Sequence, residues 1–333
     1  MEKLAIDFDS LTTNIFKVGS GMVLSEPTVV AVNTTDKNQI KAYGQEAKKL
    51  IGKTAEKTKT VFPVFEGEIV NEESAIKLLN YFLKKVGVTS RLFGVHAVFG
   101  VPCGITGDLL LKYENVAKSA GINKVYFVEA PILSALGQRV PLNDFSPCFV
   151  IDMAGGTTNV AVLSLDGIIA GFSVNVGVNK ICTDLIDYIA EVYGVQIGLL
   201  TAERIKNEIG SLSDDDGLST LVHGRDAKTG TPRAISIKAV DILTPIKKYY
   251  DKIIGLAKEL LVKLPPEVSA EIRKSGLYLS GAGVKVYDIE RYFSNEFSMK
   301  INVAENADMS VALGGGIAIG NTQLLKKISV KTK

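Results

Sequence analysis

Short apolar runs alternate with amphipathic stretches along the chain, and this alternation predicts strands interleaved with helices. Apolar runs at residues 4–8 and 149–153 are typical of buried strands. Each run is followed by a turn of small and hydroxyl residues and then by a second apolar run, at 15–18 or 160–165, which predicts a hairpin. Strands interleaved with helices indicate an α/β fold.

Further elements follow each predicted hairpin. In the first half, the pattern predicts a strand over 95–101, a helix over about 107–120 and a strand over 125–128. In the second half, a strand over 168–174 precedes an amphipathic helix. The apolar residues that this helix would place on one face are Ile181, Leu185, Ile189 and Val192.

The two predicted hairpins share a sequence pattern. Residues 6–15 read apolar-Asp, four residues, Thr-Thr-Asn and a β-branched apolar residue, and residues 151–160 repeat this order. A single copy carries little information, but two copies at the same place relative to a strand predict two related halves. The polar, Lys-rich segment 34–65 and the segment 179–244, which contains an acidic loop, are predicted to be insertions into these halves.

The predicted turns carry candidate phosphate-binding chemistry. A turn of Gly, Ser and Thr presents several backbone N–H groups to one side and can bind phosphate without Lys or Arg. Asp7 and Asp152 precede the two turns, so their carboxylates would face each other across a polyphosphate and hold Mg²⁺ largely through water. One such hairpin alone would be an ordinary β-turn, and the repetition favours the phosphate site.

Three further segments are weaker candidates. Gly281 and Gly283 follow a short apolar strand and permit close approach of the backbone to a ligand. The glycine run 314–316 is open to two interpretations, a hinge or a tight helix contact. A helical stretch places Glu203 and Lys206 on one face, for which a surface ion pair is the alternative.

Composition narrows the function classes. The chain has 333 residues, with 38 Lys and Arg against 36 Asp and Glu and a net charge of +2, which argues against a nucleic-acid partner. Cys103, Cys148 and Cys182 lack the paired spacing of a disulfide framework or a zinc ribbon, and His96 and His223 are too few for a His-based metal site. The sequence predicts neither a signal peptide nor a membrane span, so a cytoplasmic location is expected.

From residue 4 to about residue 320, the chain resembles the MreB family of bacterial actins, in the superfamily of actin, DnaK and the sugar kinases. The segments that carry the resemblance are 23–31, 100–106, 152–158 and 201–210. The resemblance implies an actin-like α/β fold with two duplicated lobes, four subdomains and a nucleotide cleft between the lobes. The implied subdomain ranges are 1–33, 66–145 and 310–333 for IA, 34–65 for IB, 146–178 and 245–309 for IIA, and 179–244 for IIB.

The resemblance also implies roles for individual residues. Asp7 and Asp152 would act on the metal and water side, holding Mg²⁺ through water beside ATP or ADP. The residues that would contact the phosphates are Leu11, Thr12, Thr13, Gly155, Gly156 and Thr157. The residues that would line the adenosine side are Glu203, Arg204, Ile205, Lys206, Gly281, Ala282, Gly283 and Val284.

The catalytic position departs from the family pattern. In MreB-like proteins a Glu directly before a Pro orients the attacking water, whereas here Ala130 precedes Pro131. Glu129 is one residue away, but neighbouring side chains on a strand point to opposite faces, so Glu129 is not expected to substitute. A positioned general base contributes about 10²–10⁴-fold to a rate. We therefore expect weak ATP hydrolysis at most, while nucleotide binding persists.

The first phosphate turn departs as well. Asp9 stands where the family has a glycine. Its carboxylate would repel the terminal phosphate, turn away from it or help to hold the metal, and the sequence leaves all three outcomes open. In the second turn Ala154 replaces a glycine, which is a milder change.

The resemblance also concerns partners and location. It implies a double filament of this chain, contacts with MreB paralogues and a peripheral contact with the inner face of the cell membrane. Leu92 and Phe93 are the membrane candidates, with an ordinary buried pair as the alternative. The excess of Lys over Arg is typical of an AT-rich genome and points to a divergent paralogue of the Spiroplasma type.

The sequence therefore predicts a cytoskeletal protein that binds ATP and forms filaments governing cell shape or helicity-based motility. A nucleotide-binding scaffold that never hydrolyses ATP is the alternative. A small-molecule kinase of the superfamily is less favoured, because no candidate base is visible beyond Asp7 and Asp152.

Overall fold

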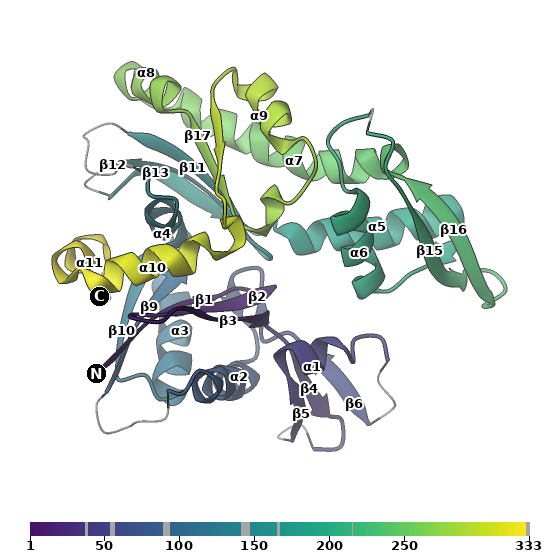
Figure 1. Cartoon of the computed structure of the whole chain (residues 1–333), viewed down its shortest axis with the longest axis horizontal. Coiled ribbons are helices and arrows are strands. Elements are labelled where there is room, and N and C mark those ends of the chain that lie inside the picture. Colours follow the sequence, from purple (N-terminus) through teal and green to yellow (C-terminus); the bar gives the residue numbers. More distant parts are fainter. Residues whose placement is uncertain are drawn as a thin grey trace.

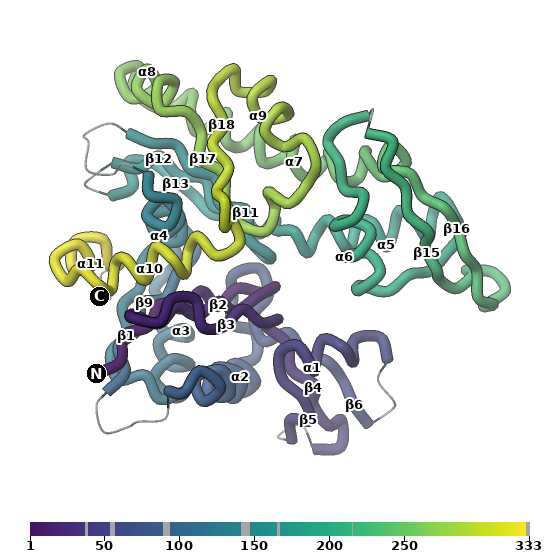
Figure 2. Tube along the Cα trace, in the orientation of Figure 1, coloured from purple at the N-terminus to yellow at the C-terminus, as the bar shows by residue number. Residues whose placement is uncertain are grey.

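A computed structural model describes residues 1–36, 39–53, 57–88, 94–140, 147–164, 167–214 and 216–330. Two lobes, each built on a five-stranded sheet, face each other, and a smaller arm with its own three-stranded sheet extends from each lobe (Figures 1 and 2). The N-terminus lies on the side of the molecule away from the arms (Figure 1).

The sheet of the first lobe contains β1 (Glu2–Phe8), β2 (Thr12–Lys17), β3 (Gly21–Pro27), β9 (Val95–Val101) and β10 (Lys124–Glu129). Its order is β10-β9-β1-β2-β3, with β1 antiparallel to β2 and parallel to β9. Two helices, α2 (Glu72–Lys85) and α3 (Gly107–Ser119), pack against it. The side chain of Asn71 caps α2 by accepting from the N–H of Ser74, which satisfies one of the free donors at the helix start.

The sheet of the second lobe contains β11 (Cys148–Met153), β12 (Thr158–Ser164), β13 (Gly167–Val174), β17 (Leu277–Ser280) and β18 (Ile301–Val303). Its order is β13-β12-β11-β17-β18, with β11 antiparallel to β12 and parallel to β17. The strand that starts each repeat therefore has the same two kinds of neighbour in both lobes. The predicted duplication and α/β class are confirmed.

The repeated Asp and Asn residues have equivalent places in the two hairpins. Asp7 lies opposite Asn14 in the β1–β2 pair, and Asp152 lies opposite Asn159 in the β11–β12 pair. Residues directly opposite on antiparallel strands have neighbouring side chains on the same face of the sheet. Each lobe thus presents one carboxylate and one amide side by side at the edge of its hairpin.

The lobes join along two helices, α4 (Ala130–Gly137) and α10 (Ser310–Gly320). A Cβ at Gly314 would lie 1.8 Å from the carbonyl oxygen of Leu133, so only glycine allows the two backbones to approach this closely. Of the two interpretations of the run 314–316, the tight helix contact is the one observed. The surrounding apolar cluster includes Val98 of the first sheet and Val150 of the second.

The helices of the second lobe surround its sheet and reach into its arm. They are α5 (Val178–Tyr193), α6 (Leu199–Ile209), α7 (Ala239–Val262), α8 (Pro266–Ser275) and α9 (Ile289–Phe297). Short 3₁₀ turns, η1 (Ala282–Val284) and η2 (Ala307–Met309), follow β17 and β18, and the terminal helix is α11 (Thr322–Ile328).

The predicted apolar face of α5 is correct at three of its four positions. Ile181, Leu185 and Ile189 are buried, but Val192 is 55% exposed. The prediction is wrong for Val192 because the helix ends one residue later, at a left-handed Gly194, and this last turn lacks the neighbours that cover the preceding ones.

The arms are small antiparallel sheets. The first contains β4 (Val30–Asn33), β5 (Ile40–Tyr43) and β6 (Thr58–Val61), followed along the chain by the pair β7 (Val64–Phe65) and β8 (Glu68–Ile69), with α1 (Gly44–Lys48) beside it. The second contains β14 (Val195–Gln196), β15 (Ser219–Asp226) and β16 (Pro232–Lys238). The subdomain ranges stay a prediction, and β4 lies before the start of the range 34–65.

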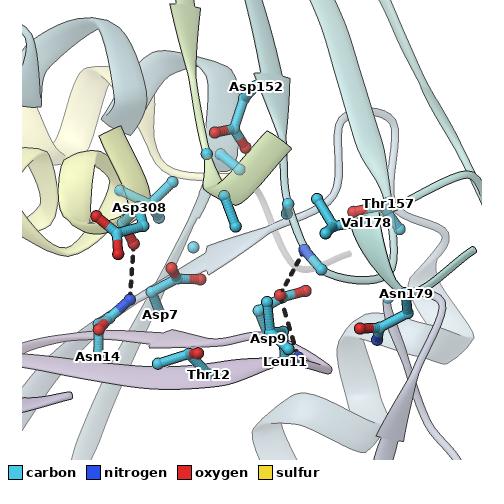
Figure 3. A pocket seen from close by; sticks show the side chains of 18 of the residues that line it. Asp7, Asp9, Leu11, Thr12, Asn14, Asp152, Thr157, Val178, Asn179 and Asp308 are labelled. Carbon is cyan, nitrogen blue, oxygen red and sulfur yellow. Dashed lines mark hydrogen bonds between the residues drawn. The ribbon is translucent and has the colours of Figure 1, made fainter. Parts of the chain in front are cut away.

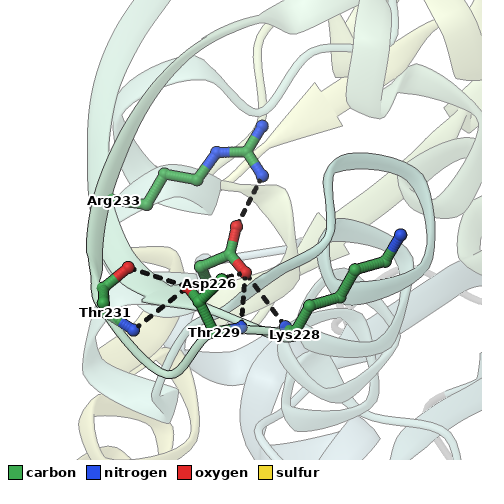
Figure 4. A network of polar contacts seen from close by, with 5 residues as sticks. All are labelled: Asp226, Lys228, Thr229, Thr231 and Arg233. Carbon is green, nitrogen blue, oxygen red and sulfur yellow. Dashed lines mark hydrogen bonds and ion pairs between the residues drawn. The ribbon is translucent and has the colours of Figure 1, made fainter.

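Asp226 organises the turn between β15 and β16 at the tip of the second arm (Figure 4). Its Oδ1 accepts from the backbone N–H groups of Lys228 (3.0 Å) and Thr229 (2.9 Å), and its Oδ2 pairs with Arg233 (3.0 Å). These backbone donors, together with Arg233, lower the pKa of Asp226 to about 2.

Candidate functional site

A cavity of about 210 Å³ lies between the lobes, where the β1–β2 and β11–β12 turns face each other (Figure 3). Both lobes and both arms contribute to its lining. The predicted site residues that line it, including the predicted catalytic position, are Asp7, Leu11, Thr12, Ala130, Asp152, Gly155, Thr157, Glu203, Lys206, Gly281 and Ala282. Residues from five separate parts of the sequence are therefore brought together at one place.

The other predicted residues lie just outside the lining, which contains none of Thr13, Gly156, Arg204, Ile205, Gly283 and Val284. Thr13 is buried on the opposite face of β2 from Thr12, and its hydroxyl lies 2.8 Å from that of Thr28. Arg204 pairs with Glu208 (2.6 Å), because neighbouring residues on a helix face different directions. These residues support the wall, and their contact with a ligand stays a prediction.

Asn14 and Asn159 line the cavity, although they were not predicted as site residues. The Asn14 amide donates to the carbonyl of Asp308 (2.9 Å), which connects the first hairpin to η2 (Figure 3). Asn159 donates to Asp152 (3.3 Å) and accepts from the N–H of Cys103 (3.0 Å). The sequence pattern could have identified them, because each Asn is the last polar residue of its repeat and stands two residues after Thr12 or Thr157. Residues two apart on a strand point to the same face.

Other lining residues had no recognisable signal in the sequence. Lys48 comes from the first arm, Tyr113 from α3, and Lys285 and Asp308 from segments beside η1 and in η2. Lys285 and Asp308 form an ion pair of 2.6 Å. Only the fold brings these distant segments to the cavity.

Three enclosed carboxylates dominate the electrostatics of the cavity. Burial raises the pKa of Asp7 well above its ordinary value, and the negative charges of Asp9 and Asp152 raise it further. Burial also raises the pKa of Asp152 to about 6, although hydrogen bonds from Ser280 and Asn159 oppose the rise. The pKa of Asp9 is raised by burial in the same way. A cation between these groups would be stabilised by all of them.

Asp9 is directed at the opposite lobe. Its Oδ2 accepts from the N–H of Gly155 (2.8 Å) and from the N–H of Leu11 (3.3 Å), and both contacts are drawn in Figure 3. The sequence left the direction of this side chain open, and the fold settles it because the two turns abut.

Ala130 is the first residue of α4 and lines the cavity, whereas Glu129 does not. The carboxylate of Glu129 instead accepts from the N–H of Gly104 at 2.6 Å. Glu129 therefore stabilises the turn that follows β9. This agrees with the expectation that Glu129 does not replace the missing Glu.

Glu203 pairs with Lys48 at 2.6 Å, and this contact joins α6 to the end of α1 across the cleft between the arms. Lys206 is 8% exposed, and burial lowers its pKa. An ion pair between Glu203 and Lys206, the alternative left open by their spacing, is not what the structure shows.

Comparison with known proteins settles the family. The model of the family described as "MreB/Mbl protein" matches residues 1–327. The chain belongs to the MreB/Mbl family. The cell shape-determining protein MreB of Escherichia coli K12 is 32% identical over 321 residues, which cover 95% of this chain and 92% of that protein.

Solved structures agree with this MreB assignment. MreB5 of Spiroplasma citri, in structures bound to ADP and to AMPPNP, has a TM-score of 0.91 and 28% identity, covering 98% of both chains. A MamK double helical filament has a TM-score of 0.81 at 16% identity, covering 96% of this chain and 99% of that one, and shows a shared fold. The predicted family, the actin-like fold and the class of actin-like cytoskeletal protein are confirmed, and the Spiroplasma-type lineage stays a prediction.

The residues of this MreB-family chain fit a nucleotide. The N–H groups of Leu11 and Gly155 both donate to one carboxylate oxygen, that of Asp9, and backbone N–H groups arranged in this way are typical of anion-binding turns. The Oδ1 of Asn14, on the cavity wall, is buried and has no hydrogen-bond partner among the described residues, so it is available to a ligand donor. Gly281 has a φ of +83°, and a Cβ there would lie 2.3 Å from the carbonyl of Met153.

The residues also fit a hard cation held through water. In the described part of the chain, no group of three or more His, Cys, Asp or Glu side chains is close enough to hold a metal directly. Carboxylate oxygens are nevertheless the ligands that Mg²⁺ accepts, and this ion keeps much of its hydration shell. Asp7 and Asp152 lie on opposite walls of the cavity (Figure 3).

The membrane candidates Leu92 and Phe93 lie outside the described residues. Among the helices of the described ranges, none combines the length and the apolar character that crossing a membrane requires.

Proposed function

We propose that this MreB-family protein binds ATP and ADP between its lobes and assembles into cytoskeletal filaments that govern cell shape or helicity-based motility, with weak ATP hydrolysis. The observation that carries the proposal is the pair of hairpins whose turns, each beside an Asp and an Asn in equivalent register, face each other across one cavity. The MreB5 structures bound to ADP and AMPPNP support a nucleotide as the occupant.

The nucleotide would lie with its phosphates at the turns and its adenosine between α6 and η1. The hydroxyls of Thr12 and Thr157 would bind phosphate oxygens, and the backbone N–H groups of Leu11 and Gly155 would bind the terminal phosphate of ATP, since these residues line the cavity near the carboxylates. On the adenosine side, the polar lining residues are Glu203, Lys206, Asn207 and Lys285. Arg204, Ile205, Gly283 and Val284 would shape this wall from behind.

Mg²⁺ would be held through water by Asp7 and Asp152, where it would neutralise part of the phosphate charge. The two carboxylates differ in the hydrogen bonds that they accept. Asp152 accepts from the hydroxyl of Ser280 (2.8 Å) and the amide of Asn159 (3.3 Å), so its orientation is fixed. Asp7 lies opposite Asn14, and a hydrogen bond with the Asn14 side chain opposes the rise in the pKa of Asp7.

Hydrolysis would be slow because Ala130, which cannot act as a general base, occupies the position on the cavity wall where the base is expected. The nearest carboxylate in the sequence, Glu129, is engaged by Gly104. A non-hydrolysing scaffold would have the same binding site, and only a measurement of phosphate release separates it from a weak ATPase. A small-molecule kinase is not favoured by any observation on this cavity.

Self-association would follow the family, as a double filament, with paralogues as additional partners. MreB and the MamK double helical filament are the related proteins that support this part of the proposal. The location would be the cytoplasm at the inner face of the cell membrane, with Leu92 and Phe93 as the contact.

Sedimentation with parallel measurement of phosphate release tests the proposal. The protein would be spun without nucleotide, with ADP and with ATP, each in the presence of Mg²⁺. We expect nucleotide-dependent pelleting, filaments in negative-stain images and little phosphate release. A protein that stays monomeric under every nucleotide condition would refute the filament function, and phosphate release indistinguishable from a no-protein blank would favour the scaffold.

A further inference from the structure

The Asp9 carboxylate spans the gap between the two hairpin turns. Its Oδ2 accepts from the N–H of Leu11 in its own turn and from the N–H of Gly155 in the opposite turn (Figure 3). A single oxygen thus takes one donor from each turn, which is how backbone amides hold an anion. Both donors belong to the residues proposed above to bind nucleotide phosphates.

The turns leave little room around this carboxylate. A Cβ at Gly155 would lie 2.3 Å from the Cβ of Leu11 and 2.5 Å from Oδ2 of Asp9, and a Cβ at Gly156 would lie 2.2 Å from Oγ of Ser10. A phosphoryl oxygen needs the same N–H groups at hydrogen-bond distance, and two anionic acceptors cannot occupy one donor position. A phosphoryl group that enters between the turns must therefore displace Asp9.

The lysines that line the cavity do not face the Asp9 carboxylate, because none of them is among the groups that shift the pKa of Asp9. Two of the lysines that line the cavity, Lys48 and Lys285, are already in ion pairs with other carboxylates. Within the described ranges, Asp9 is in no ion pair, and the charges that face it are those of Asp7 and Asp152. Displacement would therefore leave three carboxylates beside the incoming phosphate, and the two positive charges of a bound Mg²⁺ would neutralise only part of this negative charge.

We propose that Asp9 determines nucleotide specificity, by holding the place of the terminal phosphoryl group of a nucleoside triphosphate and so favouring the diphosphate. The inference rests on the proposed function, which places the end of the phosphate chain at the turns. A diphosphate is one phosphoryl group shorter and leaves the contact between Asp9 and Gly155 intact. A triphosphate must break that contact and bring its additional charge beside the carboxylate.

Binding measurements on Asp9→Ala test this assignment without relying on turnover. Dissociation constants for ADP and for the non-hydrolysable analogue AMPPNP would be measured by calorimetry with Mg²⁺, for the wild type, Asp9→Ala and the surface control Asp108→Asn. We expect the wild type to favour ADP and Asp9→Ala to shift the ratio of the two constants by at least about tenfold toward AMPPNP, which corresponds to about 1.4 kcal/mol. Asp108 is exposed at the start of α3, and its variant should leave the ratio unchanged.

Asp9→Asn keeps the inference testable if Asp9→Ala does not fold. The amide retains an acceptor for the N–H of Gly155 but has no charge, so the ratio should shift in the same direction by a smaller factor. A ratio within about twofold of the wild type in a folded variant that binds both nucleotides would overturn the role of Asp9, since about 0.4 kcal/mol is too little for a displaced anion. If neither the wild type nor the variants bind ADP or AMPPNP, the proposed function itself fails and this inference fails with it.

Discussion

Replacing Ala130 by Glu tests whether a missing base limits hydrolysis. Ala130 is the first residue of α4, is 8% exposed and lines the cavity. A longer side chain at this position starts from the cavity wall, so its carboxylate extends toward the end of a bound phosphate chain. Because Pro131 follows, the start of the helix is fixed and the new side chain should not move it.

The expected gain is at the lower end of what a general base contributes. A positioned base accelerates a reaction by about 10²–10⁴-fold, and here we expect about a hundredfold. Burial already raises the pKa of Asp7 and Asp152, and an additional carboxylate would enter the same enclosed, negatively charged space. Its own ionised form would therefore be disfavoured, and part of the catalytic advantage would be lost.

Phosphate release at saturating ATP, measured beside ATP affinity, is the assay. Ala130→Gln is the matched control, because it has nearly the same shape but cannot accept a proton. We expect release to rise in Ala130→Glu alone, with ATP affinity close to that of the wild type. Equal release from the wild type, Ala130→Glu and Ala130→Gln, with binding intact, would refute the reasoning and leave Asp9 as the next candidate for the limiting feature.

Two further predictions concern stability. Gly314→Ala should lower the free energy of unfolding by about 1–3 kcal/mol or more through overpacking, because its Cβ would lie 1.8 Å from the carbonyl oxygen of Leu133. Gly255→Ala is the control, because nothing lies within 4 Å of a Cβ at that position. Equal thermal midpoints for the two variants would contradict the close contact at Gly314. Asp226→Asn should be less stable than the wild type at neutral pH. The folded pKa of Asp226, about 2, is below the unfolded value of about 3.9, so its contribution is present above the unfolded value and is lost as pH falls toward 2. In urea unfolding, the difference in unfolding free energy between the wild type and Asp226→Asn should therefore decrease below about pH 4. A difference that does not change with pH would contradict the stabilising role of the Asp226 carboxylate in this turn.

The repeated pattern made much of the fold predictable. Two hairpins with the same Asp and Asn spacing imply two similar lobes, and the register confirms that the spacing places these residues opposite each other. The strands and the α3 helix follow local periodicity, so their positions agree with the expected ranges to within a few residues. Such features depend on neighbours in the sequence, which periodicity describes well.

The rest of the site depends on contacts between distant segments. The pairing of Glu203 with Lys48 joins two arms, and no local pattern relates these residues. The direction of Asp9 depends on Gly155 in the other lobe. The exposure of Val192 depends on what lies beside the last turn of a helix, although its spacing is that of an apolar face. Tertiary neighbours, which the sequence pattern does not describe, decide each of these outcomes.

The contact between Asp9 and Gly155 has a consequence for the protein without a ligand. Two turns that both offer mainly N–H groups cannot hydrogen-bond to each other, so two identical turns would make no direct polar contact unless an anion lay between them. In this chain the first turn has Asp9 where the second turn has Ala154. The first turn therefore supplies an acceptor, the Asp9 carboxylate, for the N–H of Gly155 in the second turn. The Asp9 carboxylate therefore connects the two turns directly, and we expect the turns to remain in contact when no nucleotide lies between the lobes.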